Sequence, residues 1–271
     1  FVPRPETEEV AQVAIDEARR VAAAGARPVV VDLCTGSGAI ALAVATEVPA
    51  SCVHAVELDA GAHAWAERNV RTVAAAAERP DLVTLVRGDA RTAVRVLDGS
   101  CDVVVSNPPY VPPGAVPVDP EVAEHDPQVA LYGLGPDGLE VPRGIAAAAV
   151  RLLRAGGLLV MEHAEVQADA ARALLEATGG FAAVETRADL TGRPRMVVGR
   201  RAARDRGPRR GPGDRDRDRG RRPRARRGGT AGAGRAVRPG QRARDQGSAG
   251  TARRSRGSRG SAGARGARSG D

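Results

Sequence analysis

The chain has 271 residues, no lysine and a formal net charge of +8, and all of the excess positive charge lies at one end. Residues 1–199 hold 17 arginines and 27 carboxylates, a net charge of −10, whereas residues 200–271 hold 24 arginines and 6 aspartates, a net charge of +18. The three cysteines form no C-x-x-C pair, which argues against a zinc site or a disulfide framework. A reducing cytosol fits these cysteines better, so we expect a cytoplasmic protein with no bound metal. No apolar run is long enough to span a bilayer, so we expect no membrane contact.

Composition divides the chain into a body, residues 1–199, and a basic tail, residues 200–271. The tail has no aromatic residue and a single large aliphatic one, Val237, so it cannot bury a core and we expect it to be disordered. Its Arg, Gly, Ala, Pro and Ser composition begins abruptly near Arg200, and a GC-rich gene read out of frame gives the same composition. Such a tail can attract nucleic acid through its charge, although it offers no aromatic side chain for base stacking.

In chain order, the body begins with a helix whose first turn is Pro5–Glu8, and then alternates short apolar runs with longer helical patterns. This alternation predicts an α/β fold with a doubly wound, mostly parallel seven-stranded sheet. Too few residues join the last two strands for a helical crossover, so the sheet should end in an antiparallel pair. The predicted strands are residues 28–33, 52–58, 82–89, 102–107, 158–163, 182–190 and 195–200. The later predicted helices are residues 39–48, 60–77 (with Trp65 in the core), 138–157 and 165–178.

The first predicted strand runs into DLCTGSGAI, residues 32–40, which contains Gly36 and Gly38. Glycine lets the backbone approach a ligand closely where a helix begins, as it does in nucleotide-cofactor loops. A tight strand-to-helix turn explains the two glycines equally well. No phosphate-binding lysine follows the loop, which excludes a P-loop.

Acidic residues end the second and third predicted strands. Glu57 lies about 20 residues beyond the glycine loop, at the spacing where a carboxylate accepts the ribose hydroxyls of a nucleotide cofactor. Asp89 can accept the exocyclic amine of an adenine ring. The alternatives are a solvated acid at Glu57 and a helix N-cap at Asp89, before Arg91. A dinucleotide would satisfy the same glycines and the same acid.

The fourth predicted strand ends in SNPPYV, residues 106–111, which makes the pattern more specific. DLCTGSG, the acid of the second strand, Gly-Asp-Ala after the third and NPPY after the fourth together resemble class I S-adenosylmethionine-dependent methyltransferases that methylate planar nitrogens. FVPRPETE, residues 1–8, and EHDPQVALYG, residues 124–133, narrow the resemblance to the HemK/PrmC family of protein-(glutamine-N5) methyltransferases. That family acts on the glutamine in the Gly-Gly-Gln loop of peptide-chain release factors.

This resemblance covers residues 1 to about 200 and implies a Rossmann-like methyltransferase fold, S-adenosylmethionine as cofactor and release factors as protein partners. We also expect a monomer. The resemblance also implies which residues act. The expected cofactor-binding residues are Cys34, Thr35, Gly36, Ser37, Gly38, Glu57, Asp89, Ala90 and Asn107, together with Phe1, Arg4 and Thr7 near the methionine end. The expected substrate-binding residues are Asn107, Pro108, Pro109 and Tyr110, of which Asn107, Pro108 and Tyr110 are the expected catalytic residues, with residues 124–127 as the wall of the substrate cleft.

The chemistry of amide methylation explains why SNPPYV suits this family. An amide nitrogen is a poor nucleophile, because its lone pair is delocalised into the carbonyl group. The side-chain oxygen of Asn107 and the carbonyl of Pro108 can accept the two substrate N–H bonds, which fixes the nitrogen for attack on a sulfonium methyl. Tyr110 can stack on the planar amide. A structural Pro-Pro turn is the alternative interpretation.

The chain departs from the family in three ways. The family usually has glycine where this sequence has Cys34, and nothing in the family resembles the basic tail. Many members also carry an N-terminal helical domain before the PRPETE motif that helps dock the release factor, and we expect this chain to lack it. Two rival functions stay open: an adenine-N6 nucleic-acid methyltransferase, and a non-enzymatic RNA-binding protein that acts through its tail. The net charge of −10 on the body argues against the first.

Overall fold

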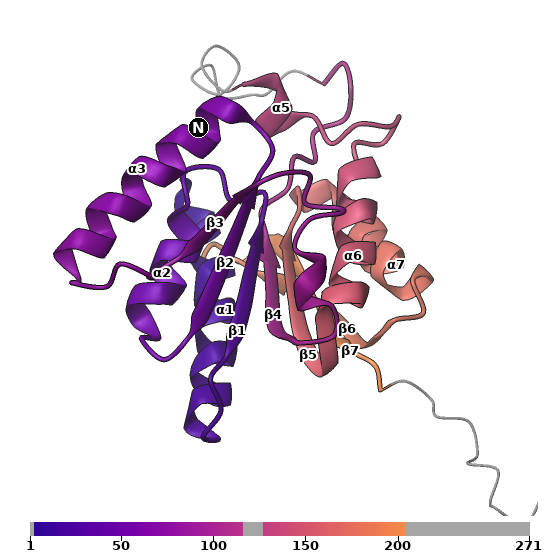
Figure 1. The fold of residues 1–271 in the computed structure, drawn as a ribbon. Helices are drawn as coiled ribbons and strands as arrows, with labels where there is room; N and C mark the ends of the chain where they lie inside the picture. Colours follow the sequence, from indigo (N-terminus) through magenta and orange to yellow (C-terminus); the bar gives the residue numbers. More distant parts are fainter. Residues whose placement is uncertain (1–2, 116–126, 204–271) are drawn as a thin grey trace, which may run out of the picture. The chain divides into compact units, whose positions relative to one another are not determined.

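The computed structural model describes residues 3–115 and 127–203, in which helices flank a seven-stranded sheet (Figure 1). The predictions for Phe1, for residues 124–126 of the cleft wall and for the tail beyond residue 203 fall outside the described residues. The strands are β1 (Val29–Leu33), β2 (Cys52–Glu57), β3 (Thr84–Arg87), β4 (Cys101–Ser106), β5 (Leu153–Glu162), β6 (Phe181–Ala188) and β7 (Pro194–Arg201).

The strand order is β3-β2-β1-β4-β5-β7-β6, and it confirms the doubly wound sheet that the sequence predicts. The first five strands in this order are parallel, whereas β7 is antiparallel to both β5 and β6. The strand order reverses between β1 and β4, where Leu33 pairs with Ser106 at the carboxyl ends of the two strands. Open α/β sheets bind their ligands at such a switch point.

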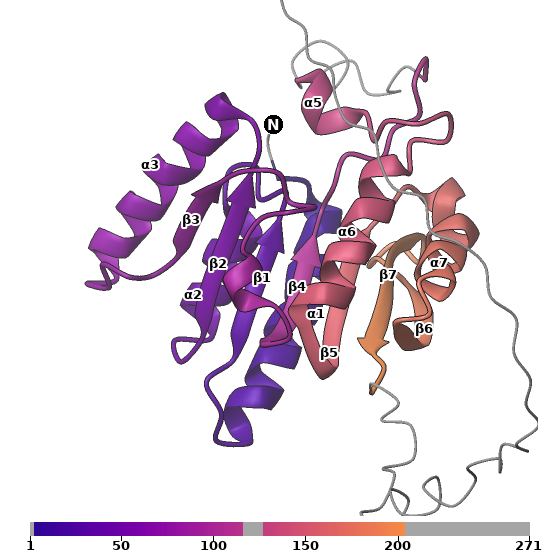
Figure 2. The ribbon, with the colours of Figure 1, turned by 45° about the vertical axis from the view of Figure 1, so that its right-hand side comes forward.

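Both faces of the sheet are covered, because consecutive strand residues point to opposite faces. In β4, Val103 and Val105 pack in the core cluster that includes α1 and α2, whereas Val104 packs in the cluster that includes α6 and α7. Figures 1 and 2 show these two helical layers on either side of the sheet. The helices are α1 (Pro5–Ala23), α2 (Ala39–Glu47), α3 (Ala60–Ala76), α5 (Gln128–Leu131), α6 (Glu140–Leu152) and α7 (Ala168–Ala177), with 3-10 turns η1 (Arg95–Leu97) and η2 (Glu165–Gln167).

The predicted helix over residues 138–157 is wrong at its end. Helix α6 stops at Leu152, and the next residue, Leu153, already belongs to β5 and pairs with Cys101 of β4. Gly156 has a φ of +78°, and the register between the two strands shifts after Cys101. The glycines that resemble a helix end therefore lie in an irregularity within the strand, because pairing with β4 outweighs the local helical pattern.

Two smaller differences concern the edges of the body. Trp65 is 59% exposed on α3, with the Arg68 guanidinium 5.2 Å from its ring centroid, so the expectation of a core tryptophan is wrong. Strand β7 continues to Arg201, two residues past the predicted boundary at 199. Within this strand, Arg200 donates two hydrogen bonds to the buried carboxylate of Glu17 and thereby joins β7 to α1.

Candidate functional site

The loop after β1 has a shape that suits glycine. The φ angles of Cys34, Gly36 and Gly38 are +64°, +57° and +85°. This left-handed region costs roughly 1–2 kcal/mol for a residue with a side chain. Cys34 therefore occupies a backbone conformation that favours the glycine usual in the family at this position. Gly38 leads directly into α2, as the sequence predicts.

Asp32 holds this loop from inside the sheet, a role that the sequence reasoning did not assign to it. One carboxylate oxygen, Oδ2, accepts hydrogen bonds from Thr35 Oγ1 at 2.5 Å and from the Ala41 backbone N–H at 3.2 Å. The other oxygen, Oδ1, has no hydrogen-bond partner among the described residues. Burial raises the pKa of Asp32 to about 7, although both hydrogen bonds act in the opposite direction. An aspartate inside an apolar strand is the sequence signal that marks it.

Glu57 lies at the carboxyl end of β2 and is only 8% exposed, so it is not a solvated strand-end acid. Its Oε2 accepts the backbone N–H of Gly36, and its Oε1 accepts the backbone N–H of Asp59, each at 2.8 Å. The carboxylate thereby ties the glycine loop to β2. Because each carboxylate oxygen can accept about two hydrogen bonds, both oxygens retain capacity for a further donor.

Asp89 follows β3 in a turn. Its Oδ1 accepts the backbone N–H of Arg91 at 2.9 Å, and its Oδ2 lies 2.7 Å from Arg91 Nη2. These hydrogen bonds lower the pKa of Asp89. Ala90 beside it is buried. The next helical segment is the 3-10 turn η1, four residues beyond Arg91, so Asp89 forms an Asx-type turn and is not a helix N-cap.

Asn107 joins a chain of hydrogen bonds at the carboxyl ends of β4 and β5. Its Nδ2 donates to Thr7 Oγ1 at 3.2 Å, and Thr7 Oγ1 donates to Glu162 Oε2 at 2.8 Å. The phenol of Tyr110 donates to the other oxygen of Glu162, Oε1, at 3.2 Å. Glu162 is 1% exposed, and burial raises its pKa. Three segments far apart in the sequence thus meet at one carboxyl group.

A second clamp fixes the backbone of the NPPY segment. Gln167 is buried, and its Nε2 donates to the carbonyl oxygens of Tyr110 at 2.8 Å and Asp137 at 3.2 Å. Gly133 and Gly138 let their own backbone lie closer to the NPPY backbone than residues with side chains could. A Cβ at Gly133 would lie 2.6 Å from the Pro109 carbonyl oxygen, and one at Gly138 would clash with the Tyr110 carbonyl oxygen. The LYGLGPDG segment, residues 131–138, therefore packs backbone to backbone against NPPY.

The predicted residues form two neighbouring groups at one edge of the sheet. The loop of Cys34 to Gly38 and Glu57 lie at β1 and β2, and Asn107 to Tyr110 follow β4, beside β1. The sequence reasoning missed Glu162, Gln167 and Asn69, whose Nδ2 donates to the Ser37 carbonyl at 2.9 Å. Arg4 precedes the first turn of α1, and Thr7 lies in that turn.

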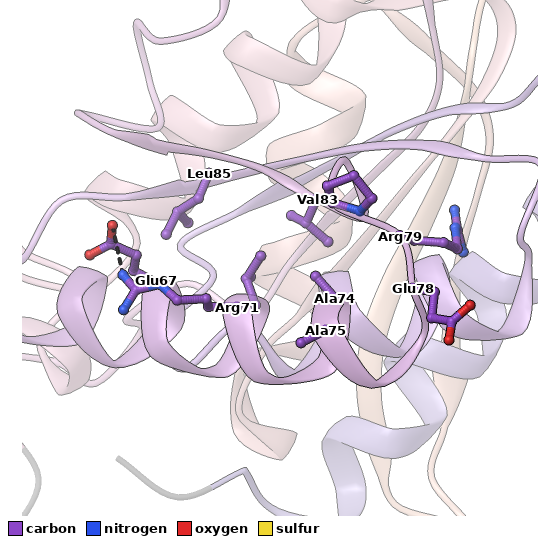
Figure 3. Close-up of a pocket in the computed structure, with 10 residues that line it drawn as sticks. Glu67, Arg71, Ala74, Ala75, Glu78, Arg79, Val83 and Leu85 are labelled. Carbon is purple, nitrogen blue, oxygen red and sulfur yellow. Dashed lines mark ion pairs between the residues drawn. The ribbon is translucent and has the colours of Figure 1, made fainter.

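Other parts of the described chain offer little comparable chemistry. The pocket in Figure 3 lies between α3 and the segment entering β3, where apolar side chains such as Val83 and Leu85 are bordered by Glu67 and Arg71. None of the predicted site residues lines it. Within residues 3–115 and 127–203, no three His, Cys, Asp or Glu side chains gather as metal ligands would. Within the same ranges, no helix has the length and apolar character needed to cross a membrane.

Three comparisons with known proteins each find methyltransferases. Residues 18–124 match the model of the methyltransferase small domain family. A release factor glutamine methyltransferase of Streptomyces coelicolor is 47% identical over 203 residues, which cover 74% of this chain and 68% of that protein. A 4-amino-L-phenylalanine/4-methylamino-L-phenylalanine methyltransferase of Streptomyces pristinaespiralis is 42% identical over 188 residues, which cover 69% of this chain and 61% of that protein. The crystal structure of an S-adenosylmethionine-dependent O-methyltransferase from Thermotoga maritima has the same fold, with a TM-score of 0.52, 14% identity and coverage of 76% of this chain and 68% of that one.

Proposed function

Because this chain belongs to the family of release factor glutamine methyltransferases, we propose that it methylates the side-chain amide nitrogen of a glutamine in a peptide-chain release factor. Family membership confirms the resemblance that the motifs of the sequence indicate. The chain is an S-adenosylmethionine-dependent methyltransferase, and the release factor is the proposed substrate. By the same resemblance, the target is the glutamine of the Gly-Gly-Gln loop.

The residues at the ends of β1, β2 and β3 fit the cofactor. S-adenosylmethionine supplies an electrophilic methyl group on a sulfonium sulfur. The Glu57 carboxylate is held in place by two backbone N–H groups and retains acceptor capacity for ribose hydroxyls. The positive φ angles from Cys34 to Gly38 turn the backbone of the loop at the start of α2, where a ligand can approach it. We assign the adenine contact to Asp89 and Ala90. We assign the methionine end to Arg4 and to the backbone of the turn that contains Thr7, because the Thr7 hydroxyl group is bonded to Glu162 and Asn107.

One observation supports the substrate assignment above the others: the orientation of the Asn107 amide. Its nitrogen donates to Thr7, so its oxygen is the end left to accept a hydrogen bond, and no described residue donates to that oxygen. An acceptor is what a substrate amide needs, because both groups on its nitrogen are N–H donors. Pro108 is buried, its ring fixes its φ angle and the following Pro109 restricts its ψ angle, so its carbonyl group is kept in one place.

The proposed mechanism is one of orientation. Asn107 Oδ1 and the Pro108 carbonyl oxygen accept the two substrate N–H bonds and hold the nitrogen with its lone pair toward the methyl group. Tyr110 packs on the planar amide and excludes water. The nitrogen loses its proton after transfer, when it has become acidic, so no side chain needs to act as a strong base.

A relative that acts on an aromatic amine gives the second candidate, because an aryl amine also presents a planar nitrogen with two N–H donors. The adenine-N6 rival has the same chemistry, but the body of the chain, residues 1–199, carries a net charge of −10 that opposes phosphate binding. All three substrates can be compared in one assay.

The deciding experiment is transfer of a radiolabelled methyl group from S-adenosylmethionine to a purified release factor. Its loop variant with alanine in place of glutamine, 4-amino-L-phenylalanine and a DNA duplex are the comparison substrates. We expect label only on the intact release factor, and label on the amino acid or the duplex alone would contradict the proposal. Asn107→Ala should lower the turnover rate by ~10²-fold or more, the effect of losing one preorganised polar contact, with calorimetry showing little change in cofactor affinity.

A further inference from the structure

The buried carboxyl group of Glu162 is the centre of the hydrogen-bond chain that reaches Asn107. It lies at the end of β5, where β7 is the antiparallel neighbour, and the α1 residue that contacts it, Thr7, is 155 residues away in sequence. Thr7 is itself only 6% exposed. A charged or polar group at this depth is costly unless its hydrogen bonds are made, so the positions of its partners are strongly restrained.

The order of donors and acceptors along this chain follows from its geometry. A hydroxyl group has one proton, and Thr7 donates that proton to Glu162 Oε2. The Thr7 oxygen can then only accept from Asn107, which requires the Nδ2 end of the Asn107 amide. If Thr7 instead donated to Asn107, the amide would turn over and present N–H to a substrate that also presents N–H.

We propose that Glu162 and Thr7 are positioning residues that set the amide orientation of Asn107, so that its oxygen faces the substrate nitrogen. Glu162 acts through Thr7 and touches neither the reacting atoms nor the cofactor. The proposal rests on the function proposed above, since it assigns residues to the same site. It gives Thr7 a role inside the protein that differs from a direct contact with the cofactor.

The role of Glu162 holds for its carboxylate and for the acid form that carries its proton on Oε1, beside Tyr110. Burial raises its pKa, whereas Thr7, Tyr110 and the positive charge of Arg195 on β7 act to lower it, and Glu6 on α1 acts to raise it further. Burial also raises the pKa of Tyr110, which stays a phenol. As a carboxylate, Glu162 accepts from both hydroxyl groups. As an acid protonated on Oε1, it donates to Tyr110 and still accepts from Thr7 on Oε2, so the direction of the chain toward Asn107 is unchanged.

The hydroxyl group of Thr7 provides the sharpest test. Thr7→Val keeps the shape of the side chain and removes both hydrogen bonds, whereas Thr7→Ser keeps the hydroxyl group. We expect Thr7→Val to lower kcat for methyl transfer to a release factor by about 10- to 100-fold, the scale found when a hydrogen-bond partner that orients a metal-binding side chain is lost. Thr7→Ser should recover most of the activity. The affinity for S-adenosylmethionine should stay near that of the wild type in both variants.

Two further variants test the carboxyl group. Glu162→Leu removes every acceptor and should reduce kcat about as much as Thr7→Val. Glu162→Gln retains an oxygen that can accept from Thr7 and should retain more activity than Glu162→Leu. Matched controls are Thr72→Val, which removes an exposed hydroxyl group bonded to the Arg68 carbonyl, and Glu17→Gln, which alters another buried carboxylate. Both controls should keep the wild-type kcat in their folded fraction.

The orientation itself can be measured without a release factor. In ¹⁵N NMR spectra, the side-chain amide protons of Asn107 should shift and exchange faster in Thr7→Val than in wild type. Unchanged amide signals, or a wild-type kcat in folded Thr7→Val, would overturn the proposal. A wild-type chain that methylates no release factor would instead contradict the proposed function, and the NMR comparison would still decide the role of Thr7. A loss of cofactor affinity in Thr7→Val at normal kcat would show that Thr7 contacts the cofactor instead.

Discussion

Replacing Glu57 by glutamine should damage cofactor binding through a contact that the structure defines on both sides. The two carboxylate oxygens accept the N–H groups of Gly36 and Asp59, one each, at 2.8 Å. Glutamine can accept only one of these donors, and its NH₂ group then faces the other donor. The loss of one hydrogen bond to a charged acceptor costs about 1.5–3 kcal/mol. Because Glu57 is 8% exposed, solvent does little to reduce that cost.

The expected effect on binding is of the same order. The same oxygens are the proposed acceptors for the ribose hydroxyls, and the Gly36 backbone is part of the cofactor loop. We therefore expect Glu57→Gln to weaken S-adenosylmethionine binding by ~10- to 100-fold, since about 1.4 kcal/mol corresponds to a factor of ten. Titration calorimetry measures the affinity, and urea unfolding measures the accompanying loss of stability.

Asp59→Ala is the matched control for this prediction. Asp59 caps α3 by accepting the Ala62 N–H at 2.8 Å, so its loss should lower the free energy of unfolding by about 1 kcal/mol. It leaves the Glu57 carboxylate in place and should leave cofactor affinity unchanged. Equal affinity losses in the two variants would mean that destabilisation alone explains the effect, and unchanged affinity in Glu57→Gln would refute the ribose assignment.

Three other predictions concern stability. The raised pKa of Asp32, about 7 against an ordinary 3.8, means that its protonated form stabilises the fold at low pH and that this contribution is lost as the pH rises through about 7. Urea unfolding should therefore show that the free energy of unfolding of Asp32→Asn rises relative to that of the wild type between about pH 4 and pH 8. A difference between the two free energies that stays constant with pH would contradict this. Burial would raise the pKa of Glu17, but hydrogen bonds from Arg200 and Arg20 outweigh this effect and hold the pKa at about 2. The stabilisation of the fold by this carboxylate is therefore present above about pH 4.5 and is lost as the pH falls toward 2. Glu17→Gln should lower the free energy of unfolding by ~1–3 kcal/mol at neutral pH, with a smaller effect in acid, and an equal effect at both pH values would refute the assignment. A chain ending at Ala203 should keep the Tm and cofactor affinity of the full chain, because Val237 is the one large apolar side chain beyond it with which to build a core. A clear drop in Tm would show that these residues contribute to the fold.

The sequence was sufficient to predict the fold wherever local patterns and tertiary pairing agree. Buried parallel strands appear in the sequence as short apolar runs. In the run VVV of β4, consecutive valines pack against helices on opposite faces of the sheet. The end of α6 could not be predicted in the same way. The residues from Leu153 to Gly157 have a helical pattern followed by a glycine pair, but Leu153 pairs with Cys101, fifty-two residues earlier. Only the neighbouring strand reveals that pairing.

The candidate site follows from one rule, and Glu162, one of the residues that the sequence reasoning missed, obeys the same rule. Polar side chains at the carboxyl ends of parallel strands meet at the ligand-binding edge of the sheet, which is how Glu57 and Asn107 were found. Glu162 ends β5 in the same way, after the apolar run LLVM, and should have been grouped with them on that pattern alone. What the pattern cannot supply is the use of each polar group. Glu57 retains capacity for a ligand because its protein donors are two backbone N–H groups, whereas Glu162 lies 1% exposed between Thr7 and Tyr110 and serves to orient Asn107. That difference depends on where the first turn of α1 packs, and it becomes visible only when residues 7 and 162 are placed 2.8 Å apart.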